Sequence, residues 1–216
     1  MLEHDRQAVA TVARQLAGAG MAVGTAGNVS VRRGDRIAIT STGATLSNLS
    51  ADDVSIVDLD GAPVEGAPAT SELALHLGAY RRFGTGAVIH AHAPVSTALA
   101  CVLEELPAVH YQIVALGGPV RVARYATFGT TELADATLDA LQDRSAVLMA
   151  NHGALTIGED LDTAMERIRL LEWVATVYWQ AATIGTPRIL NVGQLQAVRD
   201  EMARRQYGRL TPAGSS

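Results

Sequence analysis

Ala87-Val88-Ile89-His90-Ala91-His92 is a short apolar run that ends in two histidines separated by one alanine. Its length and its β-branched residues predict a buried strand. Side chains two positions apart on a strand point to the same face, so the two imidazoles should converge while Ala91 faces the core. Ser145 to Ala150 is apolar on both faces, which is typical of a central strand. These two segments predict the middle of a sheet.

Helices are expected on either side of these strands. Glu3 to Ala19 has apolar residues at helical spacing and stops at a glycine-rich turn, and Thr70-Ser71 can cap the start of a second helix. The remaining elements predicted from the pattern are helices over 94–103, 131–141 and 161–184 and strands over 35–40, 54–59 and 109–115. Strands and helices alternate without a regular βαβ rhythm, which predicts a single-domain α/β fold layered by helices.

Composition limits the classes of function. The 216 residues are 48% hydrophobic and 18% charged, enough to bury one sizeable core. The net charge is -5 and the basic residues are scattered apart from a short cluster near Met202 to Arg209, so no nucleic-acid partner is expected. A signal peptide and an apolar stretch of ~18 residues are both missing, so we expect a cytoplasmic protein without a membrane partner. Cys101 is expected to be a small buried hydrophobe.

Histidines and one carboxylate form a candidate metal site. His152 follows the central strand within Asn151-His152-Gly153, where the glycine is expected to allow a sharp turn. Two imidazoles at the His90 and His92 spacing suit zinc, although the pair can equally be two half-buried histidines. With His152 and with Glu72 at a helix start, the set is typical of a catalytic zinc site with an open position. The histidines expected not to be ligands are His4, His76 and His110.

Three turns of small residues are candidate anion sites: 24–30, 40–43 and 69–72. Each offers backbone N–H groups and hydroxyls without bulky side chains, and the third lies at a helix N-terminus, where the dipole favours an anion. Each also fits ordinary hairpin or helix-cap chemistry. The residues alone leave a phosphate-binding role open.

The order of these motifs resembles a known family. The matching segments are Gly24-Thr25-Ala26-Gly27-Asn28-Val29-Ser30, Thr42-Gly43, Thr70-Ser71-Glu72, His90-Ala91-His92, Leu106 to Tyr111, Tyr125 to Thr130, Asn151-His152-Gly153 and Tyr207-Gly208. From about Gly20 to about Arg209 the chain resembles class II aldolases of the aldolase/adducin superfamily, and within it the L-fuculose-phosphate aldolases. The resemblance implies a mixed, largely antiparallel sheet layered by helices, with a catalytic domain over 1–209. Residues 210–216 are expected to be a disordered tail.

The resemblance also implies roles for individual residues. His90, His92 and His152 match the family's zinc ligands, and Glu72 matches an acid that approaches the metal and moves protons. Tyr111 and Tyr207 match tyrosines near the aldehyde, in a homotetramer whose active sites are shared between subunits. The positions that match phosphate-binding residues are Gly27, Asn28, Thr42, Gly43, Thr70 and Ser71. Thr70 departs from the family's usual serine but keeps a hydroxyl.

The implied reaction is the reversible, zinc-dependent cleavage of a ketose 1-phosphate similar to L-fuculose 1-phosphate into dihydroxyacetone phosphate and an aldehyde. A lysine-imine mechanism is excluded because all 17 basic residues are arginine. The same scaffold also serves pentulose-phosphate 4-epimerases, decarboxylases of phosphorylated 3-keto sugar acids and thiosugar-phosphate dehydratases. Epimerases tend to carry Asp where Glu72 stands, which favours the aldolase, while the decarboxylase stays open. A non-catalytic, adducin-like binding domain would lack the histidine set.

Overall fold

The computed structural model describes residues 2–205, and these contain one nine-stranded sheet in the order β4-β3-β2-β1-β5-β9-β8-β7-β6. Every neighbouring pair is antiparallel except β7 with β8. The strands are β1 (Asn28–Arg33), β2 (Arg36–Thr40), β3 (Val54–Asp58), β4 (Pro63–Glu65), β5 (Ala87–Ala91), β6 (Glu105–Leu106), β7 (Val120–Ala123), β8 (Ala146–Met149) and β9 (Gly153–Gly158). The expected mixed, largely antiparallel sheet is confirmed.

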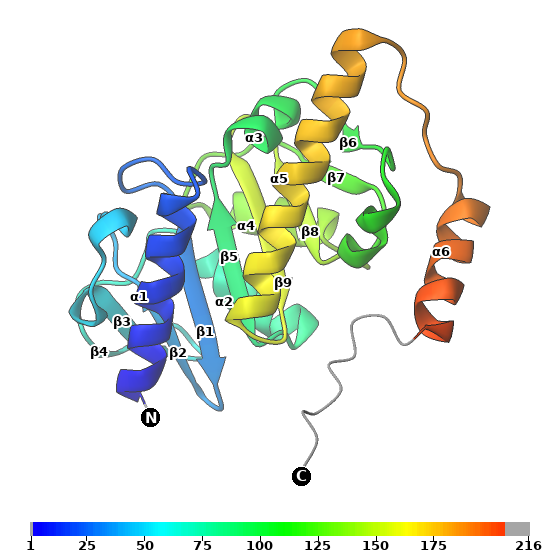
Figure 1. The fold of residues 1–216 in the computed structure, drawn as a ribbon. Helices are drawn as coiled ribbons and strands as arrows, with labels where there is room; N and C mark the ends of the chain where they lie inside the picture. Colours follow the sequence, from blue (N-terminus) through cyan, green and yellow to red (C-terminus); the bar gives the residue numbers. More distant parts are fainter. Residues whose placement is uncertain (1, 206–216) are drawn as a thin grey trace.

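Helices cover both faces of the sheet. The elements are α1 (Leu2–Gly18), α2 (Leu73–Phe83), α3 (Pro94–Ala100), α4 (Thr131–Ala140), α5 (Leu161–Ile184) and α6 (Val192–Arg204), with short 3₁₀ helices η1 (Leu46–Asn48), η2 (Ala51–Asp53) and η3 (Tyr111–Leu116). The helices α1, α3 and α5 lie on one face, α2 and α4 lie on the other, and α6 lies at the edge beside η3 (Figure 1). The fold is therefore a three-layer α/β/α arrangement.

The alternation along β5 places the first histidine. Ala87, Ile89 and Ala91 belong to the core beneath α1 and α5, whereas Val88 belongs to the core beneath α2 and α4. Because side chains alternate along a strand, His90 shares the face of Val88 and points toward α2. Both faces of this central strand are buried.

Three local expectations were wrong. The segment 109–115 is not a strand, because the His110 side chain accepts a hydrogen bond from the Gln112 N–H and the chain closes into the short-range bonds of η3. The helix expected to reach Leu103 ends at Ala100. Cys101 is therefore exposed instead of buried, and its Sγ bonds the Thr97 carbonyl.

Four strands and one α-helix were not expected: β4, β6, β7, β9 and α6. Over residues 2–205 no helix combines the length and apolar character that crossing a bilayer requires.

Candidate metal and substrate site

Three histidines meet at one end of the central strands. His90 lies on β5, His92 directly follows that strand, and His152 lies in the turn between β8 and β9. Antiparallel pairing places His90 opposite Leu155 of β9, which brings the turn to the end of β5. The ring centroids are 4.8 to 5.0 Å apart, and one nitrogen of each ring lies within 4.8 Å of the others.

The turn that carries His152 depends on two neighbours. Asn151 supplies the left-handed backbone, with φ of 54°, so the expectation that Gly153 makes the sharp turn was wrong. Gly153 is needed for a different reason. A Cβ atom there would collide with the carbonyl oxygen of Ala91 and crowd the rings of His92 and His90 at 3.2 and 3.3 Å. A glycine at this position therefore permits the close approach of the three rings.

Each imidazole is prepared to offer a lone pair. His90 Nδ1 lies 2.9 Å from the Ala154 carbonyl oxygen, which can only accept a hydrogen bond. Nδ1 therefore carries the proton, and Nε2 is unprotonated with its lone pair available. That Nε2 lies 2.9 Å from His92 Nε2. Burial, together with His90 and His152, lowers the pKa of His92 to about 4. Burial and His90 also lower the pKa of His152, so these two rings are neutral at pH 7.

Glu72 faces this cluster from the N-terminal end of α2. Its side chain is buried, and Oε2 accepts a hydrogen bond from Asn28 Nδ2 at 2.8 Å and lies 3.2 Å from His90 Nε2. Burial raises the pKa of Glu72, but His90, the Asn28 hydrogen bond and His152 outweigh it and leave the pKa below its ordinary value. The carboxylate is therefore ionised at neutral pH.

A divalent metal fits these side chains. Glu72 Oε1 is buried and has no hydrogen-bond partner among residues 2–205, although His152 Nε2 lies 3.4 Å away. A buried carboxylate oxygen normally has a partner, and a cation held by the imidazoles would supply one. Three imidazoles beside one carboxylate form a donor set that zinc accepts.

A polar cavity of about 260 Å³ adjoins the cluster. All six positions expected to bind phosphate line it, together with Glu72, His92 and His152; the six are Gly27, Asn28, Thr42, Gly43, Thr70 and Ser71. Gly27 has a φ of 89°, and a Cβ there would lie 3.0 Å from the His90 carbonyl oxygen, so a side chain is disfavoured twice. No arginine among residues 2–205 lines the cavity, which leaves backbone N–H groups, hydroxyls and the N-terminus of α2 to hold an anion.

A second, more apolar cavity of about 240 Å³ also adjoins His92 and His152. It shares Phe128, His92 and His152 with the polar cavity and adds Tyr125, Ala126 and Asn151. The rings of Tyr125 and Phe128 are unusually exposed for aromatic residues, at 61% and 67%. No role was expected for either residue, because isolated aromatics in a loop carry no spacing signal that points to a site.

Comparison with known proteins identifies the family. Residues 7–179 match the family of the Class II Aldolase and Adducin N-terminal domain. The chain belongs to the class II aldolase family. A 5-methylthioribulose-1-phosphate/5-deoxyribulose-1-phosphate aldolase of Rhodospirillum rubrum is 37% identical over 94% of this chain and 92% of its own length. A 5-deoxy-D-ribulose 1-phosphate aldolase of Bacillus thuringiensis is 36% identical over 91% of this chain and 94% of its own length.

Solved structures agree with this assignment. An L-fuculose 1-phosphate aldolase superposes with a TM-score of 0.89 at 35% identity, covering 93% of this chain and 96% of its own. The expected class II aldolase resemblance is thus confirmed, and the chain is a lyase of this type. Both of the relatives named above are aldolases of phosphorylated sugars.

Tyr111, which was expected near the aldehyde, is not brought to this site by its own chain. Tyr111 begins η3, is 46% exposed, and lines a separate apolar cavity of about 470 Å³ with residues of α6. It lines neither cavity at the histidines of its own chain. Tyr207 and the expected tail over 210–216 lie outside the described residues.

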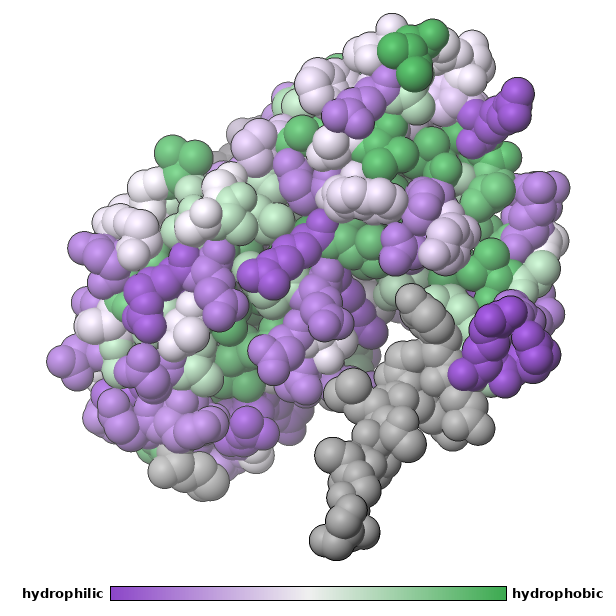
Figure 2. Space-filling view, in the orientation of Figure 1, coloured by the Kyte–Doolittle hydropathy of each residue, from purple (hydrophilic) through white to green (hydrophobic). Residues whose placement is uncertain are grey.

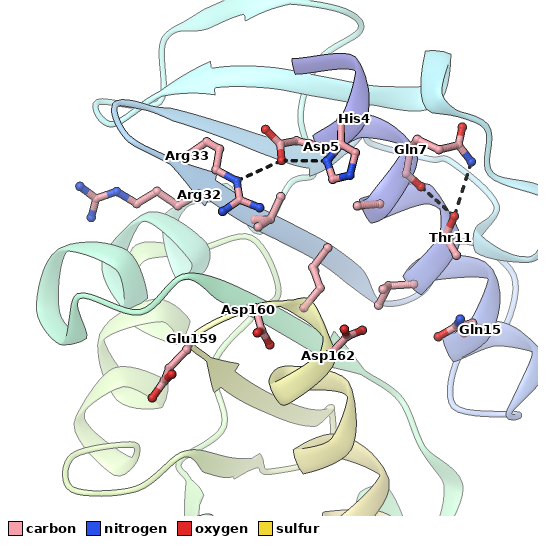
Figure 3. A pocket seen from close by; sticks show the side chains of 14 residues that line it. His4, Asp5, Gln7, Thr11, Gln15, Arg32, Arg33, Glu159, Asp160 and Asp162 are labelled. Carbon is pink, nitrogen blue, oxygen red and sulfur yellow. Dashed lines mark hydrogen bonds and ion pairs between the residues drawn. The ribbon is translucent and has the colours of Figure 1, made fainter. Parts of the chain in front are cut away.

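A charged groove lies elsewhere on the aldolase, between α1, β1 and the start of α5 (Figure 3). Its ionic groups largely satisfy one another or the backbone. Arg33 Nε lies 3.2 Å from Asp5 Oδ1, and Asp160 caps α5 by accepting from the Thr163 N–H at 2.7 Å. None of the expected site residues that the structure describes lines this groove.

Proposed function

We propose that this class II aldolase binds zinc through His90, His92 and His152 and reversibly cleaves a ketose 1-phosphate to dihydroxyacetone phosphate and an aldehyde. The observation that carries the proposal is the shared cavity. Imidazoles that can bind a metal, an ionised Glu72 and a cradle of anion-binding backbone groups all border one space of about 260 Å³. A substrate with a phosphate at one end and a reacting carbonyl at the other matches that arrangement.

Backbone groups and hydroxyls of the polar cavity are our candidates for binding the phosphate end of the substrate. Thr70 and Ser71 both line the cavity and directly precede the N-terminus of α2, where the helix dipole favours an anion. Thr42 and Gly43 add a turn from the other wall of the cavity. We assign these groups, with Gly27 and Asn28, to holding the phosphate oxygens and thereby setting the distance from phosphate to carbonyl.

The proton chemistry falls to side chains of the protein. His90, His92 and His152 would hold the zinc ion, which would supply Lewis acidity to stabilise the negative charge that develops on the substrate's carbonyl oxygen. When the bond between C3 and C4 breaks, the C4 hydroxyl loses its proton and C3 of the dihydroxyacetone phosphate fragment gains one. Glu72, as a carboxylate, is suited to exchange the proton at C3. Tyr111 is our candidate for the C4 oxygen.

The apolar cavity supports a deoxy sugar as substrate. The aldehyde fragment leaves on the side away from the phosphate, where Tyr125, Ala126 and Phe128 border His92 and His152. Relatives named for 5-deoxyribulose, 5-methylthioribulose and fuculose, itself a 6-deoxy sugar, act on ketoses with an apolar terminal carbon. We therefore propose a ketose 1-phosphate that ends in a methyl or thioether group, of which an L-fuculose 1-phosphate-like sugar is one member.

The position of Tyr111 supports a proposal of active sites shared between subunits. Its ring is half-exposed and packs against His110, which in turn lies edge-to-face on Trp173 with ring centroids 4.7 Å apart. Hydrophobic residues gather over the C-terminal half of α5 and beyond it, while the surface around β3 and β4 is hydrophilic (Figure 2). An exposed apolar surface of this kind supports association. We propose a homotetramer in which Tyr111, and Tyr207 as well, serves a neighbouring subunit, and a cytoplasmic location where sugar phosphates are formed.

A panel of ketose 1-phosphates tests the function, with release of dihydroxyacetone phosphate as readout. We expect kcat/KM for 5-deoxy-D-ribulose 1-phosphate to exceed that for D-ribulose 1-phosphate by roughly 10-fold or more, because only the second substrate must bury a terminal hydroxyl. L-Fuculose 1-phosphate and the 5-methylthio sugar complete the panel. Epimerised or decarboxylated products without dihydroxyacetone phosphate would replace the proposal with the corresponding activity.

A further inference from the structure

A chain of buried polar side chains lies beneath Glu72. Tyr80 OH lies 2.6 Å from Ser30 Oγ, which lies 2.6 Å from His76 Nδ1. On the other side of the ring, His76 Nε2 lies 2.5 Å from Asn28 Oδ1. Asn28 Nδ2 then donates to Glu72 Oε2 at 2.8 Å. The chain thus runs from α2 to β1, back to α2, again to β1 and ends at the carboxylate.

All members of this chain are removed from solvent. Ser30 and His76 are 0% exposed, Tyr80 is 1% and Asn28 is 4%. A buried polar atom without a partner costs about 1 to 3 kcal/mol, so the hydrogens are expected to distribute themselves so that every atom is satisfied. This requirement allows the direction of each hydrogen bond to be worked out.

The direction is set by the amide of Asn28. Its Nδ2 donates to Glu72 Oε2 and its Oδ1 faces His76 Nε2. Oδ1 can only accept, so His76 Nε2 carries the proton. Burial lowers the pKa of His76 to about 3, with His90 adding to the effect and Glu72 opposing it, so the ring is neutral.

The other half of the chain follows from the same rules. With the His76 proton on Nε2, Nδ1 must accept, and the Ser30 hydroxyl donates to it. Ser30 Oγ then accepts from Tyr80 OH. Every donor along the chain therefore points toward Glu72, and reversing any one bond would leave two acceptors or two donors facing each other.

We propose that His76 is a positioning residue, which locks the amide of Asn28 with its NH₂ group toward Glu72 and its second hydrogen available to substrate in the polar cavity. The proposal rests on the proposed function. Asn28 lines that cavity, so one amide would connect the group that moves protons with the groups that hold the anion. Without the His76 donor, the Asn28 amide could rotate and turn its oxygen toward the carboxylate.

Nitrogen-15 NMR of the full-length, zinc-loaded enzyme tests the direction of the chain without any substrate. With labelled histidine, and with His76 assigned by its disappearance in His76→Phe, we expect the Nε2-protonated neutral tautomer between pH 6 and 8. Protonation at Nδ1, or a charged ring, overturns the proposal. This readout is independent of whether the enzyme is an aldolase.

Kinetics test the consequence. We expect His76→Phe to slow solvent-deuterium exchange into dihydroxyacetone phosphate by about 10- to 100-fold, the usual effect of losing a partner behind a metal-site residue. His76→Gln restores an N–H donor and should recover part of the loss, which a purely space-filling role would not predict. Zinc content measured on the same samples separates loss of positioning from loss of metal.

A matched pair of serines supplies the control. Ser30 and Ser96 are both 0% exposed, and the hydroxyl of each is hydrogen-bonded. Only Ser30 belongs to the series of hydrogen bonds that ends at Glu72. Ser30→Ala should slow the exchange and Ser96→Ala should leave it unchanged. Equal exchange in Ser30→Ala, His76→Phe and wild type overturns the proposal. If the wild-type enzyme itself shows no exchange, the proposed function fails while the tautomer still decides the role of His76.

Discussion

The histidine cluster and the η3 region differ in how completely a single chain builds them. His90 and Glu72 are buried on or beside central elements, and hydrogen bonds from the same chain orient both. Tyr111 is 46% exposed, on a short 3₁₀ helix that shares its cavity with α6 at the sheet's edge. The contrast fits our proposal that one subunit organises the metal ligands and the base, while the position of the tyrosine is completed by association.

Removing a ligand should have the largest effect. We expect His92→Ala to lose bound zinc and to lower kcat/KM by more than about 10³-fold, beyond the effect of deleting one electrostatic donor. Elemental analysis should find about one zinc per wild-type chain, as a site of three imidazoles with an open position requires. His4→Ala, which changes an exposed histidine in the charged groove, is the control and should keep both metal and activity. Full metal content in His92→Ala would show that the ion binds elsewhere.

Tyr111→Phe should act on one half of the reaction. Cleavage should fall by about 10²-fold or more, the usual range for one general acid, while deuterium exchange into dihydroxyacetone phosphate and zinc content survive. Glu72→Gln should instead slow the exchange itself, because the amide cannot take up the proton.

Co-expression sharpens the contrast between the two regions. If Tyr111 serves a neighbouring subunit, mixed oligomers of His92→Ala and Tyr111→Phe chains contain some intact sites, and activity should return above that of either variant. No recovery in verified mixed oligomers would assign Tyr111 to its own chain or to the interface alone.

The polar cavity should respond more moderately. Ser71→Leu removes a hydroxyl at the N-terminus of α2 and should raise KM for a ketose 1-phosphate by roughly 10- to 100-fold, since a hydrogen bond to a charged group is worth about 1.5 to 3 kcal/mol. Zinc content should not change. Ser47→Leu makes the same replacement at an exposed position outside the cavity and is the control. Equal turnover of phosphorylated and unphosphorylated sugars by wild type would contradict a phosphate role for this cavity.

The smallest effect concerns stability of the metal-free protein in acid. His76 has a pKa of about 3 in the folded chain against an ordinary value of 6.5, so between these values the unfolded chain binds a proton that the folded chain does not. The free energy of unfolding should therefore fall as pH decreases below about 6.5, by about 1.4 kcal/mol per pH unit for this group. Urea unfolding at pH 7 and 5.5 should show a shallower pH dependence in His76→Phe. The same dependence in both proteins would exclude His76 as its source.

Local spacing predicted part of the site and distant pairing determined the rest. His90 and His92 were predictable because a strand's two-residue period needs no knowledge of its neighbours. The role of Gly153 was not, since it arises from the carbonyl of Ala91 on another strand. His76 lies one helical turn beyond Glu72, which signals a shared face, but its contact with Asn28 depends on how α2 lies over β1. Tyr111 was matched by motif, and its distance from the histidines of its own chain could be known only from the fold.

The pairing of β5 with β9 determines when the metal can be acquired. His90 and His152 come together only after strands that are more than sixty residues apart in sequence have paired, and Gly153 at the start of β9 belongs to that contact. Contacts between residues so far apart in sequence form late in folding, because closing the long loop costs conformational entropy before the contacts themselves can stabilise the structure. During synthesis, the chain must extend past β9 before a complete ligand set exists. If the cluster binds zinc as proposed, the ion stabilises a finished sheet and contributes nothing to starting one.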